Sequence, residues 1–292
     1  TVTGVQTCAL PISGPYQRRA GYDYAIQGMG GLMSITGERD DLGGGPQKVG
    51  VAVADLFTGM YATVAILAAL RHAERTGQGQ HIDMALLDTQ VAMLANLGAN
   101  YLVGGQYEGK VPGRMGNAHQ NVVPYQVFET AANPQGERDH MILAVGNDGQ
   151  FTKFCAIAGH PEWAQDPRFA KNADRVRNRS VLVPLLEAVF KTRPKADWLA
   201  DLEQHQVPGG PINNLAEVFA DPQVRERDMV TPWQHAVGTP FELVSSPMKL
   251  SRTPVRRELP PPTMGQHTEE VLKQVLHYDD ARIAQLRAAR II

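Results

Sequence analysis

One carboxylate stands where the sequence could support covalent chemistry. Asp55 directly follows an apolar run, Val49–Ala54, and a long helical pattern of apolar residues spaced three and four apart begins at once. A carboxylate at the positive end of a helix dipole stays ionised. If it is also desolvated, it can attack an activated carbonyl and form a covalent acyl intermediate. The same position suits an N-cap, and spacing alone favours that role.

The elements that must position Asp55 follow from the same pattern. Val49–Ala54 reads as a strand, and the helix after it is apolar on all sides, which predicts a buried helix. Gly77 is placed to be the left-handed residue that ends this helix. The sequence therefore predicts that Asp55 lies at a dry junction, in a cleft, between an apolar strand and the start of a buried helix.

Composition narrows the classes of function. The chain has 292 residues, a net charge of −2 and 43% hydrophobic residues, as expected of a soluble globular protein. Its basic residues are scattered and balanced by acids, which argues against a nucleic-acid partner. Asp55 and Gly59 argue against a membrane span, and no metal-ligand spacing is present. The two cysteines suggest no disulfide framework, which predicts a cytoplasmic protein.

The segment around Asp55 resembles the signature of the family III CoA-transferases, the CaiB/BaiF and formyl-CoA transferase-like group. In that family the Asp that ends this valine-containing segment is the nucleophile, and the resemblance places it at Asp55, the end of GVAVAD here. The resemblance runs from about Gly14 to the C-terminus and rests on these segments, in order: GPYQRRAGYDYAIQGMGGLMSITG, PQKVGVAVADLFTGMYATVAILAALRHAERTGQGQHIDMALLD, RMGNAHQNVVPYQVF, AVGNDGQFTKFC, DPRFAKNADRVRNR, VPGGPINNLAEVFADPQV and MGQHTEEVL.

The resemblance implies an activity and an assembly. The reaction would move CoA from an acyl-CoA thioester to a free carboxylic acid through aspartyl anhydride and aspartyl-CoA intermediates. The CoA thioester would be a substrate, with no bound cofactor and no metal. The protein would act as an interlocked homodimer. Most CoA contacts are expected in an N-terminal part of the family's domain that lies upstream of this chain.

The expected fold is α/β: an incomplete Rossmann-like large domain plus a smaller α+β domain, with a C-terminal tail that returns to the large domain. Residues 1–13 do not resemble the family and are predicted to be a non-native prefix. The remaining predicted parts are 14–101, the large-domain part with the nucleophile; 102–124, a linker; 125–230, the small domain; and 231–292, the return. From the start of the small domain onward we expect strands at 124–129 and 140–145 and helices at 149–158, 180–191, 195–205 and 215–220. Asn214 and Glu217 have the spacing of a capping box at the start of the last of these helices.

Further residues are candidates for the site. Asn117 and His119, in the loop RMGNAHQN, are candidates for binding substrate. The arginines at 175, 177 and 179 could meet CoA phosphates, although a solvated helix face is the favoured interpretation. Asp83 and Asp88 are rival candidates for the nucleophile. The favoured interpretation places Asp83 on the polar face of a strand and makes Asp88 a helix cap. A second helix is expected from Asp88 through Tyr101.

Two other functions remain open on the sequence. An α-methylacyl-CoA racemase of similar fold needs a His and an Asp as paired acid and base, and the His of that pair would fall upstream of this chain. An inactive acyl-CoA-binding fragment is the other alternative.

Formyl-CoA transferase also carries a run of glycines closed by Gln, and this sequence lacks such a run, which argues against formyl-CoA or oxalyl-CoA as substrate.

Overall fold

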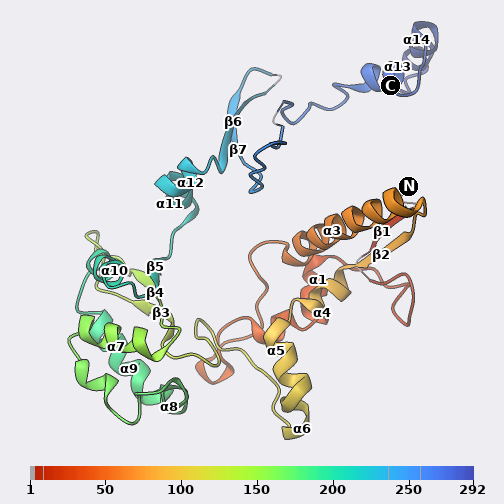
Figure 1. The fold of residues 1–292 in the computed structure, drawn as a ribbon. Helices are drawn as coiled ribbons and strands as arrows, with labels where there is room; N and C mark the ends of the chain where they lie inside the picture. The colour runs from red at the N-terminus through yellow and green to blue at the C-terminus, as the bar shows by residue number, and fades with distance from the viewer. Residues whose placement is uncertain (1–3, 9, 236, 257) are drawn as a thin grey trace. The chain divides into compact units, whose positions relative to one another are not determined.

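A computed structural model describes residues 4–8, 10–235, 237–256 and 258–292. The chain forms two compact units, Thr1–Pro211 and Ile212–Ile292 (Figure 1). The first unit holds both the region around Asp55 and most of the predicted small domain. The boundary between the two units follows Pro211, whereas the small domain was predicted to end at residue 230.

The N-terminal half of the first unit is built on a parallel strand pair. Strand β1, Gly4–Cys8, pairs in parallel with β2, His81–Ala85, with Gly4 opposite His81. Parallel strands need a long crossover, and helix α3, Val53–Thr76, lies within it and packs against β2 (Figure 1). β1 lies inside the segment 1–13, whose non-native origin stays a prediction. The other elements here are α1 Asp23–Met29, α2 Leu32–Ile35, a 3-10 turn Asp40–Leu42, α4 Leu86–Ala92, α5 Ala95–Asn100, a π-helical turn Tyr101–Gly105 and α6 Gln106–Glu108.

The predicted strand Val49–Ala54 is wrong. The backbone N–H of Val49 donates to the side-chain Oε1 of Gln27 at 2.9 Å, and the N–H of Val53 donates to the carbonyl of Val51 at 2.8 Å. Backbone groups in this segment are thus satisfied by a side chain of α1 and by a tight turn, rather than by a neighbouring strand. The helix begins at Val53, two residues before Asp55.

The helix ends are partly as predicted. Gly77 has φ 73°, and its N–H donates to the carbonyl of Ala73, which confirms the left-handed end of α3. The continuous helix expected from Asp88 through Tyr101 is instead broken between α4 and α5, where Ala95 has φ 45°.

The second half of the first unit is an α+β body. Its antiparallel sheet has the order β3-β4-β5, with Tyr125 opposite Ala144. The predicted strands and helices are confirmed to within one or two residues at their ends. The elements are β3 Tyr125–Glu129, β4 His140–Ala144, α7 Asp148–Ile157, a 3-10 turn Pro161–Ala164, α8 Asn172–Arg177, α9 Arg179–Phe190, α10 Lys195–Gln204 and β5 Gly209–Pro211.

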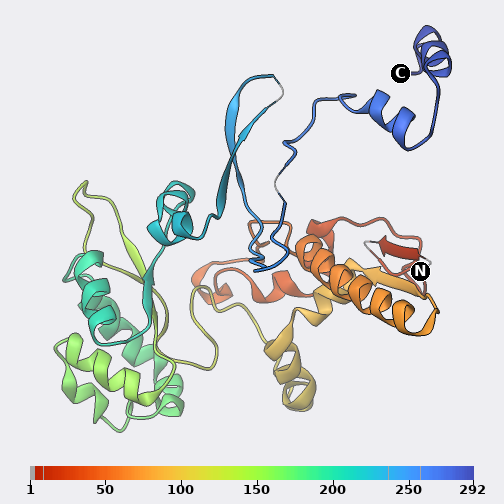
Figure 2. The same ribbon diagram turned by 45° about the horizontal axis from the view of Figure 1, so that its top comes forward.

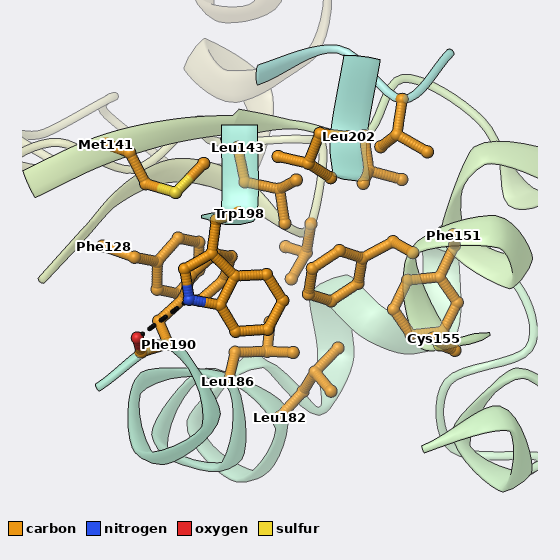
Figure 3. Close-up of a cluster of buried hydrophobic side chains, with 14 of the residues drawn as sticks. Phe128, Met141, Leu143, Phe151, Cys155, Leu182, Leu186, Phe190, Trp198 and Leu202 are labelled. Atoms are coloured by element: carbon orange, nitrogen blue, oxygen red, sulfur yellow. Dashed lines mark hydrogen bonds between the residues drawn. The ribbon is translucent and has the colours of Figure 1, made fainter. Parts of the chain in front are cut away.

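An aromatic cluster fills the space between this sheet and its helices (Figure 3). Phe128 of β3 stacks on Phe190 of α9 with ring centroids 4.5 Å apart. Trp198 of α10 is fully buried, and its indole N–H donates to the carbonyl of Phe190 at 3.0 Å. Such burial of large apolar side chains is the main stabilising term in a domain of this size. The body therefore has a core of its own, built from β3, β4, α7, α9 and α10.

The second unit consists of short elements and a hairpin (Figure 2). Asn214 and Glu217 form the predicted capping box at the start of α11. That the C-terminal part returns to the large domain stays a prediction. The elements are α11 Leu215–Ala220, α12 Pro222–Glu226, the antiparallel strands β6 Val230–Gln234 and β7 Pro240–Val244, α13 Thr268–Gln274 and α14 Asp280–Ala288.

Candidate active site around Asp55

Asp55 lies in the first turn of α3, but it is not the cap of that helix. The residue at the N-cap position is Ala52, which offers no side-chain cap. The cap is supplied by Asp23 of α1, whose Oδ1 accepts the backbone N–H of Ala54 at 2.7 Å and that of Asp55 at 3.4 Å. The interpretation of Asp55 as an N-cap is therefore wrong.

A buried amide holds this cap in place. Gln27 is fully buried, and its Nε2 donates to the Oδ2 of Asp23 at 2.6 Å. Its Oε1 accepts the N–H of Val49 at 2.9 Å. Asp23 thus uses one oxygen on α3 and the other on Gln27, and the start of α3 is fixed against α1.

The Asp55 carboxylate takes no part in this helix cap. Among the described residues, no hydrogen bond or ion pair to its side-chain oxygens is present, and the residue is exposed. The first turn of a helix favours a negative charge. The arrangement leaves a carboxylate oxygen that could act as a nucleophile. Asp55 is exposed and lines none of the four cavities described here, so the predicted dry surroundings are not found among the described residues.

The prediction that α3 is buried on all sides is also wrong. Its inward residues are small: Ala54, Thr58, Ala62, Ala69 and Ala73 are buried. Its large apolar side chains are exposed instead, with exposed fractions of 59% at Leu56, 64% at Met60, 61% at Val64 and 62% at Leu67. An apolar surface of this kind marks an interaction face. We call Leu56, Phe57, Met60, Tyr61, Val64 and Leu67 the outer face of α3.

By length and composition α3 could also cross a membrane, although a core helix of a water-soluble protein passes the same test. That the chain has no membrane partner stays a prediction.

Asn117 and His119 line two different cavities. Asn117 faces a cavity of about 550 Å³ together with residues of β3 and α9. His119 lines a smaller cavity of about 240 Å³. The two cavities share the lining residues Met115 and Ala118. The structure therefore groups Asn117 and His119 in one loop region, but in none of these cavities together with Asp55.

His119 has structural duties. Its Nδ1 accepts the N–H of Asn121 at 3.0 Å, and its ring lies against Tyr125 at 5.4 Å between centroids. Its carbonyl accepts from Nη2 of Arg179 at 2.6 Å. Because Nδ1 accepts a hydrogen bond, the remaining proton of the neutral ring belongs on Nε2. His119 therefore helps to fix its loop, and its role toward substrate stays a prediction.

The arginine cluster is not a solvated helix face. Arg175 is fully buried, where it donates to the carbonyls of Val123 at 2.6 Å and Phe169 at 2.8 Å and to Asp148 at 3.0 Å. Arg179 is half-buried, while Arg177 is exposed and paired with Asp174. Sequence reasoning missed the structural role of Arg175 because three basic residues at every second position are typical of a hydrated surface.

The two rival carboxylates lie on β2 and in the first turn of α4. Asp83 is exposed on β2, as predicted. Asp88 is not a cap, since the N-cap of α4 is Ala85 and has no side-chain cap. Among the described residues, no three His, Cys, Asp or Glu side chains gather closely enough to hold a metal ion.

Comparisons with known proteins place this chain in a family. Residues 5–268 match the model of CoA-transferase family III. The chain is 48% identical over 263 residues to a succinate–glutarate CoA-transferase of Agrobacterium fabrum, covering 90% of this chain and 62% of that protein. It is 39% identical over 280 residues to human succinyl-CoA:glutarate CoA-transferase, covering 96% and 61%. It is 33% identical over 267 residues to a succinyl-CoA:mesaconate CoA-transferase of Haloarcula hispanica, covering 88% and 61%.

Solved structures agree on the fold. A CaiB/BaiF family protein from Brucella suis superimposes with a TM-score of 0.74 at 44% identity, covering 92% of this chain and 67% of that one. A protein from Mycobacterium tuberculosis shares the fold, with a TM-score of 0.75 at 22% identity, covering 91% and 67%. The predicted α/β fold and family resemblance are confirmed. The chain spans about three fifths of the length of the curated relatives it matches.

Proposed function

This chain belongs to CoA-transferase family III, and on that premise we propose that the protein transfers CoA from succinyl-CoA to a dicarboxylic acid, with Asp55 as the nucleophile. The names of three relatives support the substrate class, since each pairs a succinyl group with a second dicarboxylic acid, glutarate or mesaconate.

One observation carries the assignment of the nucleophile. Two carboxylates lie at the start of α3, and Asp23 alone accepts the free N–H groups there. Asp23 therefore cannot attack a substrate without uncapping the helix, whereas the oxygens of Asp55 are uncommitted. The first turn of a helix favours a negative charge, and a carboxylate is the form that attacks a thioester.

The reaction proceeds through exchange of acyl groups. An Asp55 oxygen attacks the thioester carbonyl of succinyl-CoA, the C–S bond breaks, and a mixed anhydride and the CoA thiolate form. The thiolate then attacks the Asp55 carbonyl carbon, which releases succinate and leaves an aspartyl-CoA thioester. The acceptor carboxylate attacks that thioester to give a second anhydride and thiolate. Finally the thiolate attacks the acceptor's carbonyl, and Asp55 leaves as a carboxylate.

Anhydride intermediates must be kept from water. Asp55 is exposed in this chain, and the outer face of α3 beside it is apolar and uncovered. We propose that this face is covered in the working protein, with an interlocked homodimer as the assembly. A partner chain packed over Leu56 and Phe57 would also exclude water from the adjacent Asp55 carboxylate.

Trapping of the acylated carboxylate tests the proposal. Full-length protein is incubated with succinyl-CoA and hydroxylamine, which converts an acyl-aspartate into a hydroxamate that peptide mass spectrometry can locate. We expect the hydroxamate at Asp55, and no CoA transfer to glutarate by Asp55→Ala. Asp83→Ala, which removes another exposed carboxylate, is the matched control and should keep activity. Transfer by a folded Asp55→Ala protein would refute the assignment.

A further inference from the structure

Of the four cavities described above, the one lined by the most arginines is not lined by Asp55. The cavity of about 550 Å³ is lined by Arg39, Arg177 and Arg179, by the polar side chains of Asn117 and Ser180, and by two acids, Glu38 and Glu187. Guanidinium groups are the preferred protein donors to carboxylate and phosphate groups.

Two of the three arginines already have carboxylate partners. Arg39 makes a two-point contact with Asp41, at 2.8 and 2.6 Å. Arg177 pairs with Asp174 and is 72% exposed. Their charges are therefore largely compensated inside the protein.

Arg179 differs from both. Its Nη2 donates to the carbonyls of His119 at 2.6 Å and Gln120 at 2.9 Å. Its Nη1 is buried and has no hydrogen-bond partner, and no ion pair to Arg179 is found among the described residues. Burial, and to a lesser extent the charge of Arg39, lower the pKa of Arg179. A half-buried guanidinium without a carboxylate is unfavourable unless an anion compensates it.

We propose that this cavity binds an oxyanion, a carboxylate or phosphate group, with Arg179 as its main donor. The identity of the anion as a reactant rests on the function proposed above: it is either the distal carboxylate of a dicarboxylic acid or a phosphate of CoA. The site itself rests only on the cavity and on the unpaired donor. The amide of Asn117 and the hydroxyl of Ser180, which line the same cavity, are further donors for such a group.

Direct binding tests the site without using catalysis. The full chain is titrated calorimetrically with glutarate, with butyrate, which has one carboxylate fewer, and with inorganic phosphate and CoA. The variants are Arg179→Gln and Arg179→Lys. Arg138→Gln is the matched control, because Arg138 is 82% exposed and meets only Glu129 at the surface. Circular dichroism establishes that each variant is folded.

We expect Arg179→Gln to bind the anion roughly ten- to hundredfold more weakly, the usual effect of losing a charge-assisted hydrogen bond. Arg179→Lys should recover part of the affinity, and Arg138→Gln should bind like the parent. Binding of glutarate but not butyrate or phosphate identifies a substrate carboxylate, whereas competition by phosphate and CoA identifies a phosphate subsite.

Two results would overturn the proposal. One is that the parent chain binds none of these anions at millimolar concentration. The other is that folded Arg179→Gln binds as tightly as Arg138→Gln. Neither result depends on the reaction at Asp55, because hydroxamate trapping reports that chemistry separately. Arg179→Lys serves as the second variant if Arg179→Gln does not fold, and it too should bind more weakly than the parent, because a lysine cannot reproduce the two-nitrogen fork of arginine.

Discussion

The carboxylates of Asp23 and Asp55 divide two tasks at one helix terminus. Asp23, from α1, accepts the backbone N–H of Asp55 itself at 3.4 Å and that of Ala54 at 2.7 Å. Because these donors are among the first groups of α3 that lack intrahelical acceptors, the cap can come from a distant residue. The oxygens of Asp55 then take no part in the cap, as the nucleophile proposed above requires.

Removing the distant cap should therefore weaken both the helix and the site. Asp23→Ala leaves the N–H groups of Ala54 and Asp55 without their acceptor and frees Gln27 from its partner. We expect a loss of about 1 kcal/mol in the free energy of unfolding, measured in urea, and slower trapping of acyl-Asp55. Asp23→Asn keeps an accepting oxygen and should lose less of both. Equal stability of Asp23→Ala and the parent would contradict the capping role.

Local signals were predictable from the sequence, and long-range ones were not. Gly77 and the Asn214–Glu217 box act on neighbouring backbone groups, so their residue types were sufficient. The contact between Asp23 and Ala54 joins residues 31 positions apart, and no spacing rule indicates it. Val49–Ala54 has the composition of a strand, but a side chain of α1 takes up its first N–H.

Which side chains are buried was the other property that the sequence did not predict correctly. Apolar periodicity shows that a helix face avoids water, but it does not say which chain covers it. On α3 small residues such as Ala62 and Ala69 face inward, whereas Met60 and Leu67 are exposed. Arg175 shows the reverse case, because a charged residue in a basic cluster is fully buried. The family resemblance supplied Asp55, whereas its cap and surroundings required the structure.

Arg175 ties the core of the α+β body to its loops. The guanidinium donates to the carbonyls of Val123 and Phe169 and lies 4.3 Å from the ring of Phe151. In Arg175→Met these buried carbonyls lose their donor, so we expect a loss of about 3–5 kcal/mol in unfolding free energy. Arg177→Met removes an exposed arginine from the same helix and is the control, with a change under about 1 kcal/mol. Similar losses of stability in both variants would contradict the role of Arg175 in holding the core and the loops together.

Asp148, the carboxylate partner of Arg175, should make stability depend on pH. Partial burial acts to raise the pKa of Asp148, but the hydrogen bond and charge of Arg175, with Asn172 and Lys171, outweigh it and hold the pKa below its usual range. A depressed folded-state pKa stabilises the protein above the unfolded value of about 3.9, and this contribution is lost as pH falls through the folded pKa.

Asp148→Asn should accordingly be less stable than the parent at pH 7. Its deficit should shrink as the pH falls below about 4, because the parent then loses the same ionic contribution. Urea unfolding of both proteins between pH 7 and pH 3 measures the difference. Asp197→Asn is the control, because it changes an exposed carboxylate in the first turn of another helix, α10. A deficit that stays constant across this range would show that the Asp148 charge adds nothing.

Gly30 permits the close approach of α1 and α4. A Cβ built on Gly30 would collide with the Cγ of Gln90, and it would lie 2.9 Å from the Cβ of Gln90 and 3.0 Å from the carbonyl oxygen of Ile26. Gln90 is fully buried, so neither helix can yield without opening the packing. We expect Gly30→Ala to cost about 1–3 kcal/mol in unfolding free energy.

The matched change is Gly59→Ala in the interior of α3, where the added Cβ meets nothing within 4 Å. Because alanine is the better helix former, Gly59→Ala should gain about 0.5–1 kcal/mol. In the double variant Gly30→Ala/Gln90→Ala the clash with the longer side chain is relieved, so the two changes should be less harmful together than their sum. Strict additivity would place the cost of Gly30→Ala in its own backbone rather than in the contact with Gln90.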